Sequence, residues 1–271
     1  MPAIQLARLK IQTEELAAKA NDPPAFRRGL HALLDLYADR TYRPGLVGEP
    51  QPLLMAYHVP RPVLRQILSA LLSHLTRDPE IALALSDVLW SDPTYEFHLL
   101  AIFILGEFPI DLPEQILERF AAWARPTTEK RLIQALIENG LARFRQEHGG
   151  AYLAEAADRL AGKTVFLQQL GLQCLEPVIN AQDFEDYPAI TRLLAPILRD
   201  GSPALRPDLL RLIQALGKKS SKETAFFLRQ NLMHQDDNLN TAWLIRHSLP
   251  DFPVETQSYL REGLREWRMG N

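Results

Sequence analysis

The residue types best suited to binding chemistry gather late in the chain, where GKKSSKETAFFLRQ spans residues 217–230. This stretch places three lysines around an expected helix start, with Ser220 and Ser221 as natural caps. The N–H groups and partial positive charge of a helix N-terminus suit an anion such as phosphate, although a solvated loop between helices would explain the same residues. Arginines nearby in the sequence could extend this face. The predicted anion or nucleic-acid contacts in this region are Arg206, Arg211, Lys218, Lys219, Lys222 and Arg229.

A second candidate lies in the stretch TAWLIRH, where Trp243 and Arg246 are three residues apart on one face of an expected helix. One interpretation is an aromatic platform beside a guanidinium that reaches phosphate. The other is a core tryptophan with an arginine that braces the next turn. Both interpretations stay open from the sequence.

Carboxylates cluster in NAQDFEDYP at 180–188. They could serve acid–base chemistry or bind a divalent cation, but no histidine lies nearby and Pro188 favours a capped turn. The seven histidines show no His-Glu-x-x-His spacing, and a single cysteine excludes an internal disulfide and a multi-cysteine zinc module. That cysteine, Cys174, lies among apolar residues and is expected in the core. We predict no metal and no cofactor.

Composition indicates a folded soluble protein, since 46% of the 271 residues are apolar and 23% are charged. The formal net charge of −3 argues against binding to nucleic acid by bulk charge alone. The balance is nevertheless acidic over residues 61–125 and mildly basic over 201–271. The N-terminal stretch lacks the apolar middle of a signal peptide, and the apolar run near LLAIFIL is too short to span a membrane. A cytoplasmic protein is therefore expected.

Recurring dipeptides indicate where helices begin. Asp or Ser accepts a hydrogen bond from the first turn, and Pro at the first position lacks a donor that would stay unpaired. The predicted starts are Asp22-Pro23, Asp78-Pro79, Asp92-Pro93 and Ser202-Pro203. After Asp92-Pro93, the segment FHLLAIFIL is apolar nearly all round and is expected to be buried, with Trp90 as a wedge in the preceding turn.

The pattern predicts helices of roughly 10–18 residues joined by short turns. Alternating β-branched runs and hairpin turns are lacking, so the sequence predicts an all-α fold. Many antiparallel pairs in succession favour a right-handed α-solenoid of degenerate HEAT-like repeats over a closed bundle. We predict an N-terminal helical pair at 1–40, an irregular connection at 41–56 and a repeat array at 57–271, with which the N-terminal pair is expected to be continuous.

Three segments together resemble the HEAT-like DNA alkylation repair family, which includes alkylpurine DNA glycosylases. YHVPRPVLRQI at 57–67 is similar to the family's first helix, and LWSDPTYEFHLLAIFIL at 89–105 is similar to its Leu-Trp and the Leu-rich helix that follows. LNTAWLIRHSLPDFPVETQSYL at 239–260 is similar to a late helix pair. The resemblance spans about residues 55–265, and it implies the helical-repeat fold and contact with DNA through a basic concave surface.

The chain departs from this family where catalysis is expected. Active members carry a tryptophan and an aspartate on a helix after the segment that resembles 89–109. Trp123 is present here, but no aspartate occurs between Asp111 and Asp158, and Glu129 and Glu138 are the nearest acids to the expected helix. A second tryptophan of the active members has no clear counterpart. The resemblance therefore implies the fold without implying catalysis.

Two main interpretations of function follow. The preferred one is a non-catalytic scaffold whose concave face holds DNA or another protein, since repeat arrays suit extended surfaces. The alternative is a divergent DNA glycosylase with Glu129 or Glu138 in the place of the missing acid and Trp123 or Trp243 near the damaged base. A protein–protein adaptor is a further alternative, and the oligomeric state is left open.

Overall fold

The chain is all-helical over residues 5–41, 53–75, 78–108, 113–234 and 238–270, which are the parts that the computed structural model describes. This confirms the predicted all-α class, since the described residues form no strand and only an isolated bridge joins Met55 to Thr94. The predicted irregular connection at 41–56 lies for the most part outside the described residues.

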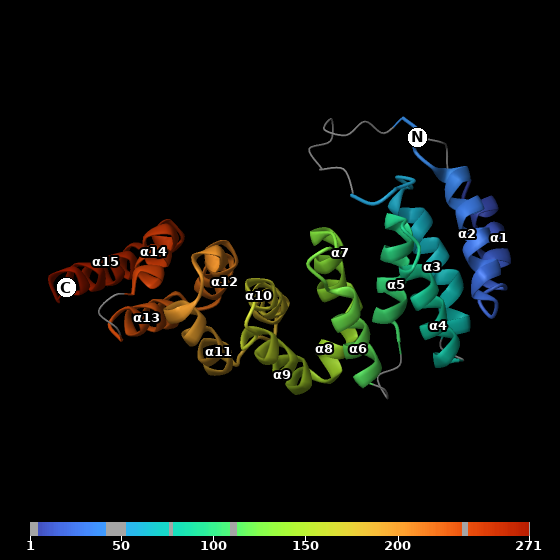
Figure 1. Ribbon diagram of the computed structural model, residues 1–271. Coiled ribbons are helices and arrows are strands. Elements are labelled where there is room, and N and C mark those ends of the chain that lie inside the picture. The colour runs from blue at the N-terminus through green and yellow to red at the C-terminus, as the bar shows by residue number, and fades with distance from the viewer. Residues whose placement is uncertain (1–4, 42–52, 76–77, 109–112, 235–237, 271) are drawn as a thin grey trace. The chain divides into compact units, whose positions relative to one another are not determined.

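Contacts divide the chain into two compact units, residues 1–147 and 148–271 (Figure 1). The helices of unit 1 are α1 (Leu6–Ala17), α2 (Pro23–Tyr37), α3 (Arg61–Leu75), α4 (Pro79–Trp90), α5 (Tyr95–Gly106), α6 (Pro113–Trp123), α7 (Lys130–Ala135), a π-helix (Leu136–Gly140) and α8 (Ala142–Glu147). Those of unit 2 are α9 (Gly149–Leu160), α10 (Val165–Asn180), α11 (Tyr187–Asp200), α12 (Arg206–Lys219), α13 (Ser221–Leu232), α14 (Leu239–Ser248) and α15 (Val254–Gly270), with short 3-10 turns at Pro203–Leu205 and Leu249–Asp251.

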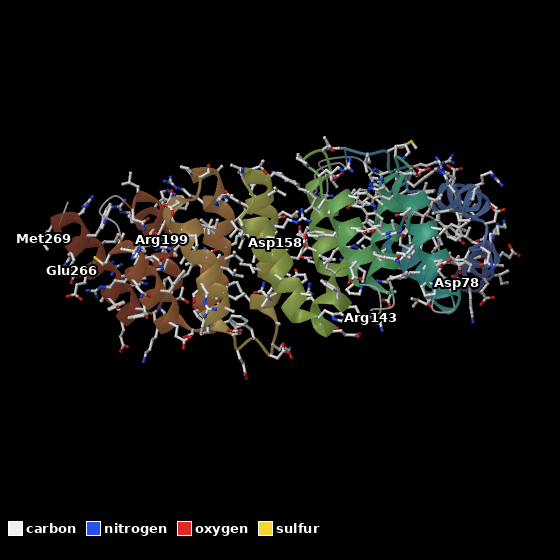
Figure 2. The ribbon with its side chains drawn as sticks, turned by 60° about the horizontal axis from the view of Figure 1, so that its bottom comes forward. Asp78, Arg143, Asp158, Arg199, Glu266 and Met269 are labelled. Carbon is white, nitrogen blue, oxygen red and sulfur yellow. The ribbon has the colours of Figure 1, made fainter. Side chains whose placement is uncertain are left out.

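Each unit is built from alternating rows of helices. In unit 1, α1 packs on α3, α3 on α5 and α5 on α7, while α2 packs on α4. In unit 2, α10, α12 and α14 form one row and α9, α11, α13 and α15 form the other. Exposed side chains such as Asp78 and Arg143 in unit 1 and Asp158 and Glu266 in unit 2 project from the ribbon (Figure 2). Within the described residues, no helix has the length and apolarity that crossing a bilayer needs.

Several predicted helix starts are confirmed. Asp22 accepts a hydrogen bond from the Ala25 amide at 3.0 Å, and Asp78 accepts from Glu80 and Ile81. Ser202 caps the short turn Pro203–Leu205. These caps satisfy amides that the first turn of a helix leaves without partners.

The prediction for Asp92-Pro93 is wrong in detail. Helix α5 begins at Tyr95, after Thr94, and the Asp92 side chain does not cap it. Asp92 is buried, and its carboxylate bonds to Thr94 and to side chains of α2. A distant helix therefore uses the carboxylate that the sequence pattern assigned to local capping.

Helix α5 forms the core of unit 1, as its apolar sequence predicts. Phe97, Leu100 and Ile104 are almost completely buried, and α5 packs against α3, α4, α7 and the π-helix. Burial of each such side chain stabilises the fold by about 1.5–3 kcal/mol. Trp90, at the end of α4, is held close beside this helix. In unit 2, Cys174 is buried, which confirms its predicted place in the core.

The close approach of α5 to the π-helix depends on a glycine. Gly106 ends α5 directly against the backbone carbonyl of Asn139, and a Cβ atom there would overlap this oxygen. The neighbour in the way is backbone, so it cannot move aside by changing a rotamer. The contact requires the absence of a side chain at residue 106.

We therefore expect Gly106→Ala to lower the free energy of unfolding by about 1–3 kcal/mol, the usual cost of overpacking. Gly149→Ala is the matched control, because nothing lies within 4 Å of a Cβ atom at Gly149. Urea unfolding followed by circular dichroism measures both variants. Equal stability of the two would contradict the close backbone contact.

Candidate functional site

Unit 1 contains a pocket of about 440 Å³ to which four helices and an extended segment contribute. This volume lies in the range of small-molecule sites, roughly 300–1,000 Å³. Its lining residues are Leu53, Leu54, Trp90, His98, Ala122, Trp123, Arg125, Thr127, Thr128, Glu129 and Leu132.

A stack of three aromatic rings forms one wall of the pocket. The Trp90 ring lies between those of His98 and Trp123, with centroid separations of 4.2 Å and 4.5 Å. The two tryptophan planes differ by only 9°. Since Trp90, His98 and Trp123 belong to α4, α5 and α6, the stack joins three helices. All three rings line the pocket.

A carboxylate faces the same pocket. Glu129 directly precedes α7, is partly buried, and accepts a hydrogen bond from the Leu53 amide at 3.0 Å. The turn that connects Trp123 to Glu129 is fixed by Thr128, whose hydroxyl donates to the Trp123 carbonyl at 2.6 Å. The aromatic wall and the acid are therefore held together by one short turn.

The polar groups of the pocket differ in charge. Burial lowers the pKa of His98, although the carbonyls of Asp92 and Trp90 and the charge of Asp92 act in the opposite direction. Its imidazole is therefore neutral at pH 7. Arg125 is exposed at the pocket, and Thr127 and Thr128 add hydroxyl groups. The pocket combines an aromatic wall with a hydrogen-bond acceptor, a neutral imidazole and a cation.

The extended segment Leu53–His58, called the strap below, closes one side of the pocket. The Tyr95 amide donates to the Met55 carbonyl at 2.8 Å, and the buried Glu96 accepts from the amides of Tyr57 and His58. His58 has a φ of 54°, an unfavourable region for a residue with a side chain. The 2.7 Å bond from its amide to Glu96 helps to hold it there.

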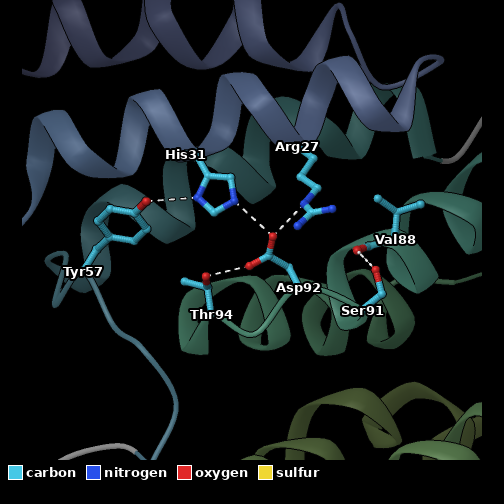
Figure 3. A network of polar contacts seen from close by, with 7 residues as sticks. All are labelled: Arg27, His31, Tyr57, Val88, Ser91, Asp92 and Thr94. Carbon is cyan, nitrogen blue, oxygen red and sulfur yellow. Dashed lines mark hydrogen bonds and ion pairs between the residues drawn. The ribbon is translucent and has the colours of Figure 1, made fainter.

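A polar network around the buried Asp92 ties α2 to the rest of the site (Figure 3). Asp92 accepts from the Arg27 Nε at 2.6 Å, from the Thr94 hydroxyl at 2.6 Å and from the His31 Nε2 at 3.0 Å. The other ring nitrogen of His31 lies 2.9 Å from the Tyr57 hydroxyl. An ionised carboxylate only accepts, so His31 donates through Nε2, and its Nδ1 in the neutral ring accepts from Tyr57.

The ionisation of Asp92 follows from these contacts. Burial alone would raise its pKa, but the hydrogen bonds from Thr94, His31 and Arg27 outweigh it and hold the pKa below the usual value. The folded state therefore binds this proton less readily than the unfolded state does. The stabilisation is complete above the ordinary aspartate pKa of about 3.9 and is lost as the pH falls through the folded value.

We expect Asp92→Asn to lower the free energy of unfolding at pH 7 by about 2 kcal/mol. This is less than the about 3–5 kcal/mol for breaking a fully buried ion pair, because Arg27 and His31 are partly exposed. The variant should also lose less stability between pH 5 and 2. Urea unfolding across this range measures both effects, with the exposed Asp158→Asn as control. A pH dependence as steep as in the wild type would show that Asp92 does not carry this stabilisation.

The structure places the two glutamates that are candidates for the catalytic acid in different environments. Glu129 lines the pocket together with Trp123, whereas Glu138 is exposed on the π-helix and accepts a hydrogen bond from Gln134. The sequence alone does not assign Trp90 or His98 to a site. Their spacing of eight residues across a turn was visible, but their convergence on Trp123 depends on the packing of α6.

The predicted cations of unit 2 fall into different environments. Arg211 pairs with Asp208 and Glu176, and Arg229 pairs with Glu262 and Glu266 while lying over the Tyr259 ring. The charges of these two arginines are therefore balanced within the protein. Lys219 ends α12 and donates to the Ala181 carbonyl, whereas the side chains of Lys218 and Lys222 are exposed. The three lysines thus flank the junction of α12 and α13, where Ser220 caps α13.

Trp243 has partners other than Arg246. The Arg206 guanidinium lies 5.2 Å from the centre of the Trp243 ring, and His247 stacks on this ring at 3.8 Å. Arg206 also donates to Asn240 at 3.0 Å. Arg246 is exposed on the same helix. The arrangement is a partly exposed aromatic ring between two nitrogen-rich side chains.

The acidic cluster of unit 2 is a capped turn, as its sequence favours. Asp186 accepts from the Ala189 amide at 3.0 Å and caps α11. Over the described residues, no three or more His, Cys, Asp or Glu side chains come together as metal ligands.

Comparison with known proteins identified one matching family model. The model, described as DNA alkylation repair enzyme, matches residues 55–247. No curated protein and no solved structure matched the chain. The matched region includes every residue of the pocket except Leu53 and Leu54.

Proposed function

The chain belongs to the DNA alkylation repair enzyme family, and from this premise we propose that it is a DNA-binding helical-repeat scaffold whose pocket in unit 1 receives an unstacked base. The observation that carries the proposal is the convergence of Trp90, Trp123 and Glu129 on one pocket. Its volume and aromatic lining suit an aromatic heterocycle, and Glu129 can accept a hydrogen bond from the edge of such a ring.

The repeat architecture supports this proposal. Alternating rows of helices within each unit are the arrangement expected of stacked helix pairs, and we propose that the whole chain forms a right-handed α-solenoid of HEAT-like repeats. Such an array offers an extended surface along which a duplex can lie. The cytoplasmic location expected from the sequence accords with this function and stays a prediction.

We propose that exposed cations of unit 2 contact the DNA backbone. Lys218, Lys222 and Arg246 have exposed side chains, and Arg206 and Trp243 present a cation beside a ring. Arg211 and Arg229 are less suited to this role because carboxylates already balance their charges. Phosphate contacts supply most of the affinity of proteins that bind DNA without regard to sequence.

We expect the double variant Lys218→Ala/Lys222→Ala to weaken binding to duplex DNA about tenfold at 0.1 M salt and to reduce the slope of log Kd against log salt by about 2. Fluorescence anisotropy with a labelled duplex that carries one N-methylated purine measures both quantities. Lys10→Ala in α1 is the control, since Lys10 is an exposed lysine of unit 1. Absence of DNA binding by the wild type at low salt would reject the proposal and leave a protein as partner.

A second candidate function is base excision, which the position of Glu129 favours. In this reaction the bond between C1′ and the base nitrogen breaks and the base leaves with its bonding electrons. The oxygen of a water molecule bonds to C1′, and that water releases one proton to the solvent. A carboxylate near C1′ stabilises the positive charge that develops on the sugar. Glu129 would supply this charge in the place of the missing aspartate, beside Trp123.

Glu129→Gln separates the two candidates because it removes the charge and retains the shape. If the protein excises bases, we expect the variant to release N-methylated purine about 100-fold more slowly, while its affinity for DNA changes less than threefold. Glu138→Gln, on the exposed π-helix, should be unaffected. Binding by the wild type without any release of base would reject excision and retain the scaffold.

A further inference from the structure

His31 lies outside the matched family region, yet it contacts two segments that build the pocket. Through Nδ1 it bonds to Tyr57 of the strap at 2.9 Å, and through Nε2 to Asp92 at 3.0 Å. Asp92 follows Trp90 by two residues, and the strap begins with Leu53. One imidazole on α2 therefore joins the two segments, as Figure 3 shows.

Each of these segments reaches a functional group of the pocket. The amide of Leu53, at the start of the strap, donates to the Glu129 carboxylate at 3.0 Å. The turn at Asp92 connects Trp90 at the end of α4 to α5, which carries His98. The strap and the turn are in turn joined by the 2.8 Å bond from the Tyr95 amide to the Met55 carbonyl.

We propose that His31 is a positioning residue for the pocket, which sets the place of the Glu129 carboxylate through the strap and that of Trp90 through Asp92. Other bonds also hold the strap: the Asp39 amide donates to the Tyr57 carbonyl at 3.1 Å, the Tyr95 amide donates to Met55, and strap amides donate to the carboxylates of Glu96 and Glu129. The bond from Tyr57 to His31 adds a side-chain contact to α2. The ring of His31 is itself fixed by Phe97 of α5, at a centroid distance of 4.3 Å. Helix α2 thereby acts on a pocket that it does not line. The inference rests on the proposed function only for the identity of the ligand.

Two tyrosine variants provide a matched test. Tyr57→Phe removes the hydroxyl that bonds to His31, while Tyr37→Phe removes a hydroxyl on α2 that donates to Gln12 of α1 at 2.7 Å. Each loses one side-chain hydrogen bond of ordinary length. Only the Tyr57 bond leads to the strap.

The first measurement needs no ligand. Amide hydrogen exchange of Leu53, followed by NMR, reports how firmly the strap is held to Glu129. We expect Tyr57→Phe to accelerate this exchange about fivefold and Tyr37→Phe to leave it unchanged. His31→Ala should accelerate it further, and His31→Gln should restore part of the protection, because its carboxamide can donate to Asp92 and accept from Tyr57. Equal exchange in the Tyr57 and Tyr37 variants would overturn the proposal.

The second measurement is affinity for the duplex with one N-methylated purine. We expect the variants whose Leu53 amide exchanges faster to bind this duplex more weakly. Affinity should fall about fivefold for Tyr57→Phe and stay unchanged for Tyr37→Phe. Unchanged affinity despite faster exchange would overturn the positioning role. If no variant and no wild-type protein binds the duplex, the proposed function fails, whereas the exchange measurement still decides whether His31 holds the strap at Glu129.

Discussion

The ionised carboxylate of Asp92 is the interaction on which the arrangement of unit 1 depends. An aspartate buried among apolar helices is tolerated only if its charge is compensated and its oxygens are bonded. Arg27, His31 and Thr94 meet this requirement, and two of them come from α2. The need to satisfy one charge therefore fixes where the N-terminal helices lie relative to the turn between α4 and α5. The strap is joined to the same helices through the bond between Tyr57 and His31.

The pocket arises from long-range packing of short local motifs. Trp90 ends one helix, His98 lies in the first turns of the next, and Trp123 ends a third. Stacking of aromatic rings favours their mutual contact beyond the area that they bury. Glu129 is brought to the same place because a hydroxyl–carbonyl bond closes the turn after Trp123. The acid has one oxygen engaged by the strap, so its chemistry depends on how firmly the strap is held.

Much of the fold could be predicted from local patterns, whereas the site could not. The caps at Asp22 and Asp78 and the burial of α5 depend on neighbouring residues and appear directly in the sequence. Asp92 looked identical to those caps, but its carboxylate is satisfied by residues 61 and 65 positions away. The bond between Leu53 and Glu129 spans 76 positions. No spacing rule predicts such pairs. The pairing of Arg229 with Glu262 and Glu266 is likewise long-range, whereas that of Arg211 with Asp208 is local, at a spacing of three residues on one helix.

The π-helix at Leu136–Gly140 has a consequence for how this chain is compared with its relatives. A π turn accommodates one additional residue within an otherwise α-helical segment, so it acts as a local insertion. Each residue of an α-helix rotates the chain by about 100°, and side chains after the insertion point are turned by that amount relative to an uninterrupted helix. Against a relative with an uninterrupted α-helix here, an alignment without a gap between 135 and 141 would therefore equate side chains on different faces. The π turn thus sets which face the side chains after Gly140 occupy.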